Sequence, residues 1–354
     1  MHEHTGGATD LGIERVLDHD LADQWHRVVS AAADTDYVGL PADPVQELYQ
    51  SLAGIDKDRR MEYWLGSVAG EPVVAGEVTV PLLDNVKSAS LDVEVHPAFR
   101  RRGYGSAMFS RLTERALAAG RTRLFAAACE PIDIAARPSA PGSVFGRKVG
   151  ARAVTAEIRR MLTVAELDRP RLAALTADAE SRSSGYSLVQ WTDRAPSELL
   201  DDLAVLMGLM STDAPIEDME WEPEAWTAQR YHDQQEAVAA RGRRRIVTVA
   251  RHDASQRVVA YTDVTIPATQ PHIADQWSTI VHGEHRGHRL GMLIKLANLE
   301  LLLATEPKVR FINTWNAGVN EHMVSINEAM GFRQMERWRE WQLDLSTDRV
   351  VASR

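Results

Sequence analysis

Two segments of the sequence share one pattern of apolar and polar positions. In each, a short run of strand-forming residues, 89–95 or 276–281, leads into a polar turn rich in basic residues and glycine. After the turn, apolar residues recur three and four positions apart, which is the spacing of one helix face. They are Met108, Leu112, Ala116 and Leu117 in the first segment and Leu293, Leu296, Ala297 and Leu301 in the second. The pattern therefore predicts the same unit of strand, turn and helix twice.

The two turns also align residue by residue. Residues 95–105 and 281–291 lie 186 positions apart, and four residue types recur in step, among them the pairs Val95/Val281, Arg100/Arg286 and Gly105/Gly291. A repeat of this length indicates two copies of one domain.

Each turn has the features of an anion-binding site. The first backbone N–H groups of a helix have no partner inside the helix, and the helix dipole adds partial positive charge there. Glycine lets a pyrophosphate approach the backbone closely, and arginine neutralises phosphate charge. Neither turn has the Gly-Lys-Ser/Thr ending of a Walker loop or the three glycines of a dinucleotide fingerprint. The turns therefore predict phosphate binding of another type.

Both halves of the chain open in a similar way. A strand-like run, 13–16 or 186–189, precedes a helical pattern, 21–33 or 197–210, and a strand-like run at 157–163 closes the first half. The stretch between the halves contains Pro170 and ends in a serine-rich run before Gly185, which is typical of a connector. We predict domains at 1–163 and 186–354, a linker at 164–185, and mixed α/β architecture in each domain.

Composition narrows the class of protein. A chain of 354 residues, 44% hydrophobic, can bury two ordinary cores, since a domain commonly holds about 100 to 200 residues. The net charge of −10 argues against a protein that wraps nucleic acid. The one cysteine, Cys129, excludes an internal disulfide and a CxxC metal site.

Targeting signals are also missing from the sequence pattern. No apolar run approaches the roughly 18 residues of a membrane span, and the first residues lack a basic-then-apolar signal. We expect a cytoplasmic monomer or homodimer without a nucleic-acid or membrane partner. We also expect no metal, because phosphate contact or exposure to solvent explains the four histidines near the turns: His96, His282, His285 and His288.

The turns resemble the signature of the GCN5-related N-acetyltransferases (GNAT): a strand ending in valine, then Arg or Gln, two residues, Gly, one residue, and Gly or Ala. In the first copy Arg100, Gly103 and Gly105 match fully. The second copy has Arg286 and Gly291, but it has Arg289 in place of the first glycine.

A second landmark of the family is a strand followed by a small helix that ends in Gly-Phe. Residues 311–317 and 320–332 match this pattern, whereas the first copy has Ala151 after Gly150. The resemblance covers nearly the whole chain and implies an α/β fold of two tandem GNAT domains. Mycothiol synthase shares this two-domain plan, but no motif of the chain matches its acceptor site.

The resemblance implies an acetyl-CoA cofactor at the turns. In the second copy it assigns cofactor contacts to Val281, Arg286, Gly287, His288, Arg289, Leu290, Gly291, Met292, Asn320 and Asn327. In the first copy it assigns them to Val95, Arg100, Arg101, Arg102, Gly103, Tyr104, Gly105 and Ser106. Asn320 also suits a plain helix cap.

Acyl transfer to an amine needs an oxyanion donor and a group that takes the proton of the amine. By the resemblance, the backbone amide of Thr279, or of Val93 in the first copy, faces the acyl carbonyl. Asp275, four residues before Thr279, is our candidate base; the alternative is that it lies in a loop before the strand. For Asp92 and Glu94, we favour a solvated strand face.

The acid that protonates the leaving thiolate is a tyrosine in many members of this family. That position holds Asn327 in the second copy and Gly146 in the first. Tyrosine acid catalysis is therefore not expected in either copy.

The acceptor site is less visible in the sequence. The acidic segment 210–224 carries Asp213 and Glu217, either of which suits a cationic amine, and Trp221, whose ring offers a face to it. Trp277 is expected to line the same pocket. The alternative is a solvated acidic loop with one aromatic residue in the core.

Three functions remain open from the sequence. We favour an acetyl-CoA-dependent N-acetyltransferase that acts on a small-molecule amine and uses the C-terminal copy. The alternatives are catalysis by the N-terminal copy and a non-catalytic acyl-CoA-binding protein.

Overall fold

The structure is a computed structural model and describes residues 10–132, 140–213 and 218–345. The chain divides into two compact units. Unit 1 comprises Met1–Thr155 and Trp338–Arg354, and unit 2 comprises Ala156–Arg337. Each unit contains one copy of the repeat, so the predicted mixed α/β class with two domains is confirmed.

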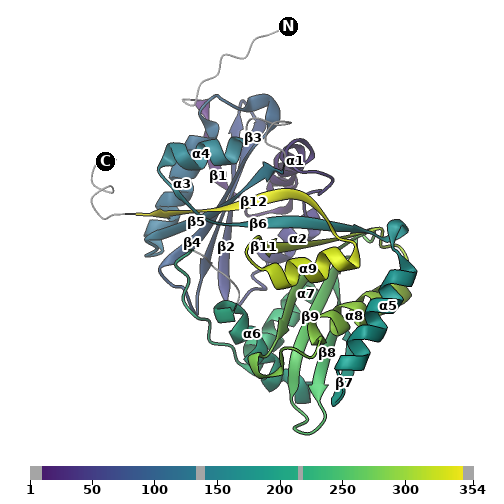
Figure 1. Cartoon of the computed structure of the whole chain (residues 1–354). Helices are drawn as coiled ribbons and strands as arrows, with labels where there is room; N and C mark the ends of the chain where they lie inside the picture. Colours follow the sequence, from purple (N-terminus) through teal and green to yellow (C-terminus); the bar gives the residue numbers. More distant parts are fainter. Residues whose placement is uncertain (1–9, 133–139, 214–217, 346–354) are drawn as a thin grey trace. The chain divides into compact units, whose positions relative to one another are not determined.

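Unit 1 contains a sheet with strand order β1-β2-β3-β4-β5, followed by β12 (Figure 1). Its elements are β1 (Gly12–Arg15), α1 (His19–Asp36), α2 (Val45–Leu52), β2 (Arg59–Val68), β3 (Glu71–Pro81), β4 (Ser88–Val95), η2 (Pro97–Phe99), α3 (Tyr104–Ala118), β5 (Arg123–Pro131) and α4 (Pro141–Val149). Strands β1 to β4 are antiparallel, and β4 pairs with β5 in parallel.

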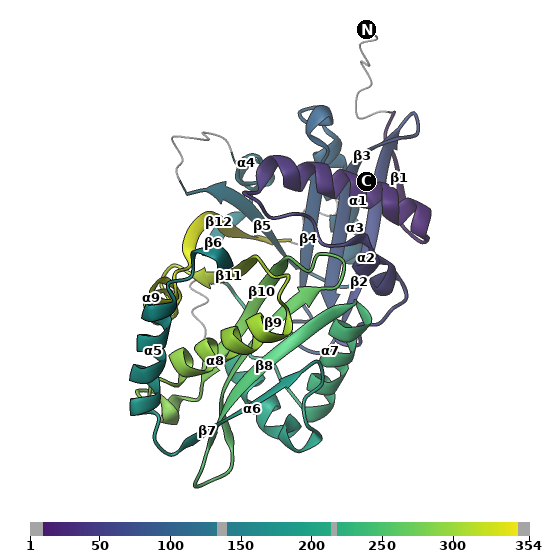
Figure 2. The same ribbon diagram turned by 90° about the vertical axis from the view of Figure 1, so that its right-hand side faces the viewer.

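Successive side chains of β3 point to opposite faces of the sheet, and they therefore pack in two different cores. Val74 and Val78 pack with Met108 and Leu112 of α3 on one face. Ala75 packs on the other face, with residues of α1 and α2. Figure 2 shows α1 lying across the strands of this unit. The sheet of unit 1 is thus covered by helices on both faces.

Unit 2 contains a sheet with strand order β6-β11-β10-β9-β8-β7. Its elements are β6 (Arg152–Thr163), η3 (Val164–Glu166), α5 (Arg169–Arg182), β7 (Tyr186–Thr192), η4 (Ser197–Leu199), α6 (Leu200–Asp213), α7 (Ala228–Ala240), β8 (Arg243–His252), β9 (Val258–Pro267), β10 (Ile273–Val281), η5 (Gly283–His285), α8 (Leu290–Thr305), β11 (Phe311–Ala317), α9 (Glu321–Met330) and β12 (Arg333–Asp344). The boundaries between the units fall inside β6 and β12.

The two faces of this sheet are also covered. On one face, Ile246 and Val264 pack with α8 and with Leu172 of α5. On the other face, Val247 and Tyr261 pack with α6 and α7. Strand β10 pairs with β11 only from Ile273 to Gln276, so the two strands are unpaired beyond that point.

The structure differs from the predicted boundaries. The predicted linker 164–185 contains α5, whose Leu172 and Ala179 are buried in the core of unit 2. Residues 157–163 of β6 pair with β11 in unit 2, and Leu343 of β12 packs in the core of unit 1. The prediction assumed that consecutive elements pack together. Instead, the last strand of each repeat completes the sheet of the other unit.

Candidate functional site

The turn of the second copy has the geometry of an anion site. Strand β10 ends at Val281, and α8 begins at Leu290. Gly287 and Arg289 have positive φ angles of 88° and 58°. Arg289 therefore adopts the left-handed conformation that Gly103 has in the first copy, with φ 92°. A residue with a side chain adopts this conformation at some cost in free energy. Because Arg289 nevertheless adopts it, the replacement of the family glycine leaves the backbone of the turn unchanged.

A cavity of about 790 Å³ opens at this turn. Strand β10, the turn, α8 and the start of α9 line it. Eight of the predicted cofactor residues line it: Val281, Arg286, Gly287, Arg289, Leu290, Gly291, Met292 and Asn320. A Cβ on Gly291 would lie 3.4 Å from Ile326 and 3.7 Å from Val281, which shows how closely α8, α9 and β10 meet here.

Arg286 is held in place by a carboxylate. Its Nη2 donates to Asp213 Oδ2 at 2.6 Å, and its Nε donates to the carbonyl oxygen of Val281 at 3.3 Å. Asp213 lines the cavity, but its carboxylate is bound to the signature arginine. We predicted Asp213 as a site for a cationic amine, and the structure shows it as the partner of Arg286. Glu217, the other acidic candidate, lies outside the described residues.

Two predicted cofactor residues do not line the cavity. Asn327 is fully buried, and its Nδ2 donates to Asn316 Oδ1 at 2.5 Å. The ring of His288 lies 5.3 Å from that of Tyr186. Asn320 does line the cavity, and it also caps α9, since its Oδ1 accepts from the Met323 backbone N–H at 3.2 Å.

Strand β10 is irregular at the edge of the cavity. Its register against β9 shifts between Gln276 and Thr279. A bulge takes backbone groups out of the ladder, and the Ser278 N–H donates to the Asp263 side chain at 3.0 Å. Thr279 lines the cavity, and its hydroxyl lies 2.8 Å from that of Thr262.

Asp275 lies in a buried polar network outside the lining of this cavity. Its Oδ2 accepts from Arg243 Nη1 at 3.1 Å, and its Oδ1 accepts from Asn313 Nδ2 at 3.2 Å. Arg159 then donates to Asn313 and pairs with Glu336 at 2.7 Å. Asp275 belongs to strand β10, which is one of the two possibilities that the sequence left open, and its carboxylate pairs with Arg243.

Trp277 and Trp221 have different surroundings. Trp277 is 52% exposed, although its Nε1 donates to Thr265 Oγ1 at 2.8 Å and its ring stacks on Trp315 at 5.9 Å and 14°. Trp277 thus offers an open ring face beside the bulge, but, contrary to the expectation that it lines the pocket, it is not among the residues that line this cavity. The Nε1 of Trp221 donates to Glu224 at 3.3 Å, and Trp221 is not among the residues that line the cavity.

The turn of the first copy is folded in the same way. Arg100 binds both carboxylate oxygens of Asp36, at 2.9 and 2.6 Å. Lys148 donates to Ser106 at 3.3 Å, and the Arg102 guanidinium lies 5.4 Å from the ring of Phe99. Val95 packs against the core of unit 1, and Tyr104 is buried in that core. A Cβ added to Gly105 would lie 3.2 Å from the Val95 side chain. Arg101 and Gly103 have positive φ angles.

A small cavity lies beside β4 and β5 in unit 1. The cavity there measures about 90 Å³, and Phe109, Phe145 and Trp341 line it. Phe109 and Phe145 pack edge to face at 5.6 Å. None of the cofactor residues predicted for the first copy lines this cavity.

Sequence reasoning missed one pair in unit 1. The Tyr37 hydroxyl donates to Glu94 Oε1 at 2.9 Å. Burial raises the pKa of Glu94 to about 7, and burial together with Asp92 raises the pKa of Glu77 to about 8. Glu77 lies directly opposite Asp92 in the ladder. The prediction of a solvated strand face overlooked Tyr37, which is 57 residues away from Glu94 in the chain.

Among the helices that the structure describes, none has the length and apolar character needed to span a membrane.

The comparisons with known proteins agree with this geometry. The model of the acetyltransferase (GNAT) family matches residues 25–139. The search of curated proteins found no match. A tandem GNAT protein from the clavulanic acid biosynthesis pathway, solved without acetyl-CoA, is 29% identical, with a TM-score of 0.79 over 94% of this chain and 98% of that one.

Two further solved structures are alike in fold. A GCN5-related N-acetyltransferase from Sphaerobacter thermophilus has 13% identity and a TM-score of 0.66 over 96% of this chain and 97% of its own. A GCN5-related glucosamine N-acetyltransferase region of a fungal multi-domain GH3 β-N-acetylglucosaminidase has 14% identity and a TM-score of 0.66, over 94% of this chain and 38% of that one. Residues 25–139 therefore form an acetyltransferase domain of the GNAT family, and the whole chain has the fold of a tandem GNAT protein.

Proposed function

We propose that the protein is an acetyl-CoA-dependent N-acetyltransferase for a small-molecule amine, and that unit 2 binds the cofactor. The observation that carries this proposal is the cavity of about 790 Å³ at the turn of the second copy. It combines the open N-terminus of α8 with an elongated wall from β10 to α9. These are the features that the phosphates and the pantetheine arm of CoA require.

The residues present fit this cofactor. The first N–H groups of α8 and the dipole of this 16-residue helix favour a pyrophosphate. Gly291 lines the cavity in the first turn of α8, and Arg286 and Arg289 place two guanidinium groups at the cavity wall, paired with Asp213 and Asp178. Val281 and Thr279 on β10 border the part of the cavity toward the bulge.

The first copy is proposed not to bind CoA. Its turn matches the family signature more fully, but the cavity beside β4 and β5 measures only about 90 Å³, and Phe109, Phe145 and Trp341 line it. The sequence signature predicts only the conformation of the turn. Cofactor binding also requires a cavity beside the turn that is large enough for CoA.

The chemistry follows from the bulge in β10. Acetyl-CoA, when bound, would supply the acetyl group: the amine of the acceptor attacks the carbonyl carbon, the new C–N bond replaces the C–S bond, and the CoA thiolate leaves and takes a proton from water. We assign the backbone N–H of Thr279 to the developing oxyanion, because the bulge removes neighbouring groups from the β9 ladder. The proton of the amine passes to water, since Arg243 neutralises Asp275.

The acceptor is proposed to sit over Trp277. Its open indole face lies beside the bulge that carries Thr279, and Trp315 and Thr265 fix its orientation. A rigid aromatic face of this kind packs on the apolar part of a substrate.

A second candidate is catalysis by unit 1. Two observations favour it: the family model matches residues 25–139, and Glu94 has a pKa near 7, which suits a general base at neutral pH. This candidate requires Phe109 and Phe145 to separate.

A matched pair of variants tests the proposal. Gly291→Glu adds a negative side chain at the start of α8, and Gly105→Glu does the same at α3. Thiol release from acetyl-CoA is followed with a panel of primary amines, and melting temperatures identify misfolded variants. We expect loss of turnover in Gly291→Glu alone. Loss in Gly105→Glu alone would favour unit 1, and binding of CoA by the wild-type chain without turnover of any amine would indicate a non-catalytic protein.

A further inference from the structure

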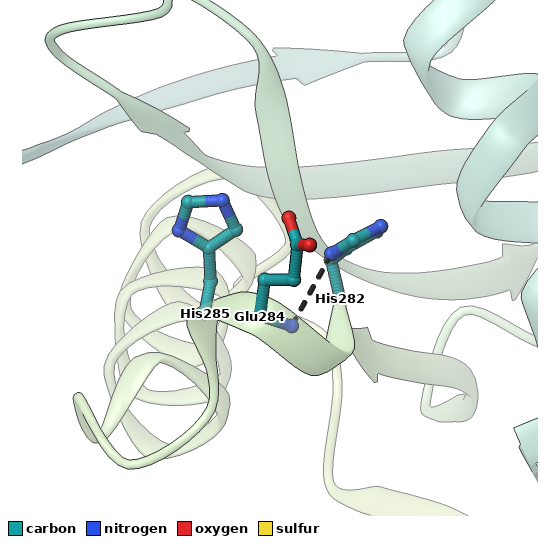
Figure 3. A group of neighbouring side chains, drawn as sticks. All are labelled: His282, Glu284 and His285. Carbon is teal, nitrogen blue, oxygen red and sulfur yellow. Dashed lines mark hydrogen bonds between the residues drawn. The ribbon is translucent and has the colours of Figure 1, made fainter.

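Three side chains with metal-binding groups gather on the outer wall of the cofactor turn. The ligand atoms of His282, Glu284 and His285 all lie within 4.8 Å of one another. Figure 3 shows the Glu284 side chain standing between the two imidazole rings. His252 adds a third histidine, since its ring lies 4.9 Å from that of His285.

The histidine rings are already oriented by other protein groups. Nδ1 of His285 lies 2.9 Å from the Tyr186 hydroxyl, and Nδ1 of His252 lies 2.9 Å from Ser255 Oγ. Each contact engages one ring nitrogen and leaves Nε2 available. Metal-binding histidines characteristically have the second ring nitrogen held by a neighbouring group in this way.

Glu284 has no role in folding the turn. In residues 10–132, 140–213 and 218–345, its carboxylate makes no hydrogen bond or ion pair. Its position is also unfavourable for the cofactor, because a free carboxylate beside an anion-binding turn repels phosphate. A divalent cation held between Glu284 and the histidines removes this repulsion.

The first copy shows which of these groups the turn itself requires. His96 occupies the position of His282, and the two rings cap their short helices alike, accepting from the N–H two residues later at 3.3 and 3.4 Å. The counterparts of Glu284 and His285 are Ala98 and Phe99. The turn therefore folds without a carboxylate or a second histidine, and the second copy alone has the complete donor set.

We propose that His282, Glu284 and His285 form a binding site for a divalent transition metal ion of the zinc class. Two imidazoles and one carboxylate form a donor set that zinc uses in proteins, at about 2.0–2.2 Å from the ion. The exposed Glu284 side chain closes the remaining distance by rotation. His252 or water completes the coordination. His285 also lines the cofactor cavity, so the bound ion adds positive charge to its wall. From the sequence alone, we expect the histidines near the turn to contact phosphate or solvent. The free carboxylate of Glu284 and the oriented histidine rings favour a metal ion instead.

Calorimetric titration of zinc chloride into the metal-free full chain, without an affinity tag, tests this site. We expect one saturable site per chain, weakened more than about tenfold by Glu284→Gln or His285→Ala. His96→Ala is the matched control and leaves binding unchanged. So does the double change His2→Ala with His4→Ala, which removes the two histidines at the start of the sequence.

Two further measurements keep the result interpretable. Melting temperatures without metal show that the variants fold, and bound Co²⁺ reports nitrogen and oxygen ligation through its visible absorption. No saturable site in the wild-type chain, or binding that Glu284→Gln and His285→Ala leave unchanged, would overturn the proposal.

Discussion

Arg286 and Asp213 form an ion pair at 2.6 Å that repeats the pair between Arg100 and Asp36 in the first copy. In both copies the aspartate is the last residue of a helix, α6 or α1, that precedes the signature arginine by a long stretch of chain. The repeat thus preserves a contact between the turn and the end of this helix. Asp213 is a partner of the turn rather than a free carboxylate for a substrate.

Replacing Asp213 with Asn tests this assignment. The pair is partly exposed, so its loss costs about 1 kcal/mol of stability or less. The cavity wall becomes one charge more positive, and we expect acetyl-CoA to bind more tightly, with no change in KM for the amine. Calorimetry and steady-state kinetics measure the two effects. A large rise in the amine KM with unchanged CoA affinity would restore Asp213 to the acceptor site.

Trp277 is predicted to determine acceptor binding. Trp277→Ala raises KM for the acceptor by up to about tenfold, since an aromatic contact contributes about 0.5–1.5 kcal/mol. Trp277→Phe retains most of the affinity, and the CoA dissociation constant stays the same in both variants. Trp221→Phe is the control, because Trp221 lies outside β10 and its Nε1 donates to Glu224. An effect confined to Trp221→Phe would show that the acceptor lies elsewhere.

Asp275 is predicted to act in stability. Asp275→Asn removes the negative charge of a largely buried pair with Arg243 at 3.1 Å, and we expect it to destabilise the protein by about 3 kcal/mol in urea denaturation. The control is Glu114→Gln, which removes an exposed pair with Arg111 and costs about 1 kcal/mol or less. If Asp275→Asn keeps its stability but loses turnover, with a shifted pH profile, Asp275 is the general base.

Lys295 is predicted to lower the stability of the fold near neutral pH. It is buried on α8 beneath Phe332, and burial lowers its pKa to about 7. From about pH 7 to about pH 10, the unfolded chain binds a proton at this amine that the folded chain does not bind. Stability therefore rises with pH across this window, by up to about 1.4 kcal/mol per pH unit. Below pH 7 the full penalty is present.

Lys295→Met removes this dependence. Phe109 occupies the equivalent position of α3, so an apolar residue suits the site. We expect a higher free energy of unfolding at pH 7 and a flatter profile from pH 7 to 10, measured by denaturant titration at each pH. Lys308→Met, at an exposed lysine, serves as control. A variant less stable than wild type at pH 7 would show that the Lys295 amine has a stabilising partner.

The sequence predicts the local parts of this structure well. The turns at 95–105 and 281–291, the helices that follow them and the Gly-Phe ending of α9 depend on contacts within a few residues. The backbone of Arg289 also follows the repeat, because its neighbours impose the left-handed conformation that Gly103 adopts freely.

The remaining features depend on pairings between distant residues. Asp213 meets Arg286 across 73 positions, and Tyr37 meets Glu94 across 57. The positions of β6 and β12 in the strand order have no local signal, because they depend on pairing with strands that are distant in the sequence. The small cavity in unit 1 is lined by Phe109, Phe145 and Trp341, whose proximity appears only in the fold.

The stoichiometry of acetyl-CoA binding tests the central claim most directly. Acetyl-CoA is titrated by calorimetry into the wild-type chain, Gly291→Glu and Gly105→Glu, each at a concentration well above the dissociation constant. The account predicts one site per chain, lost in Gly291→Glu and retained in Gly105→Glu. Two sites, or one site lost only in Gly105→Glu, would contradict it.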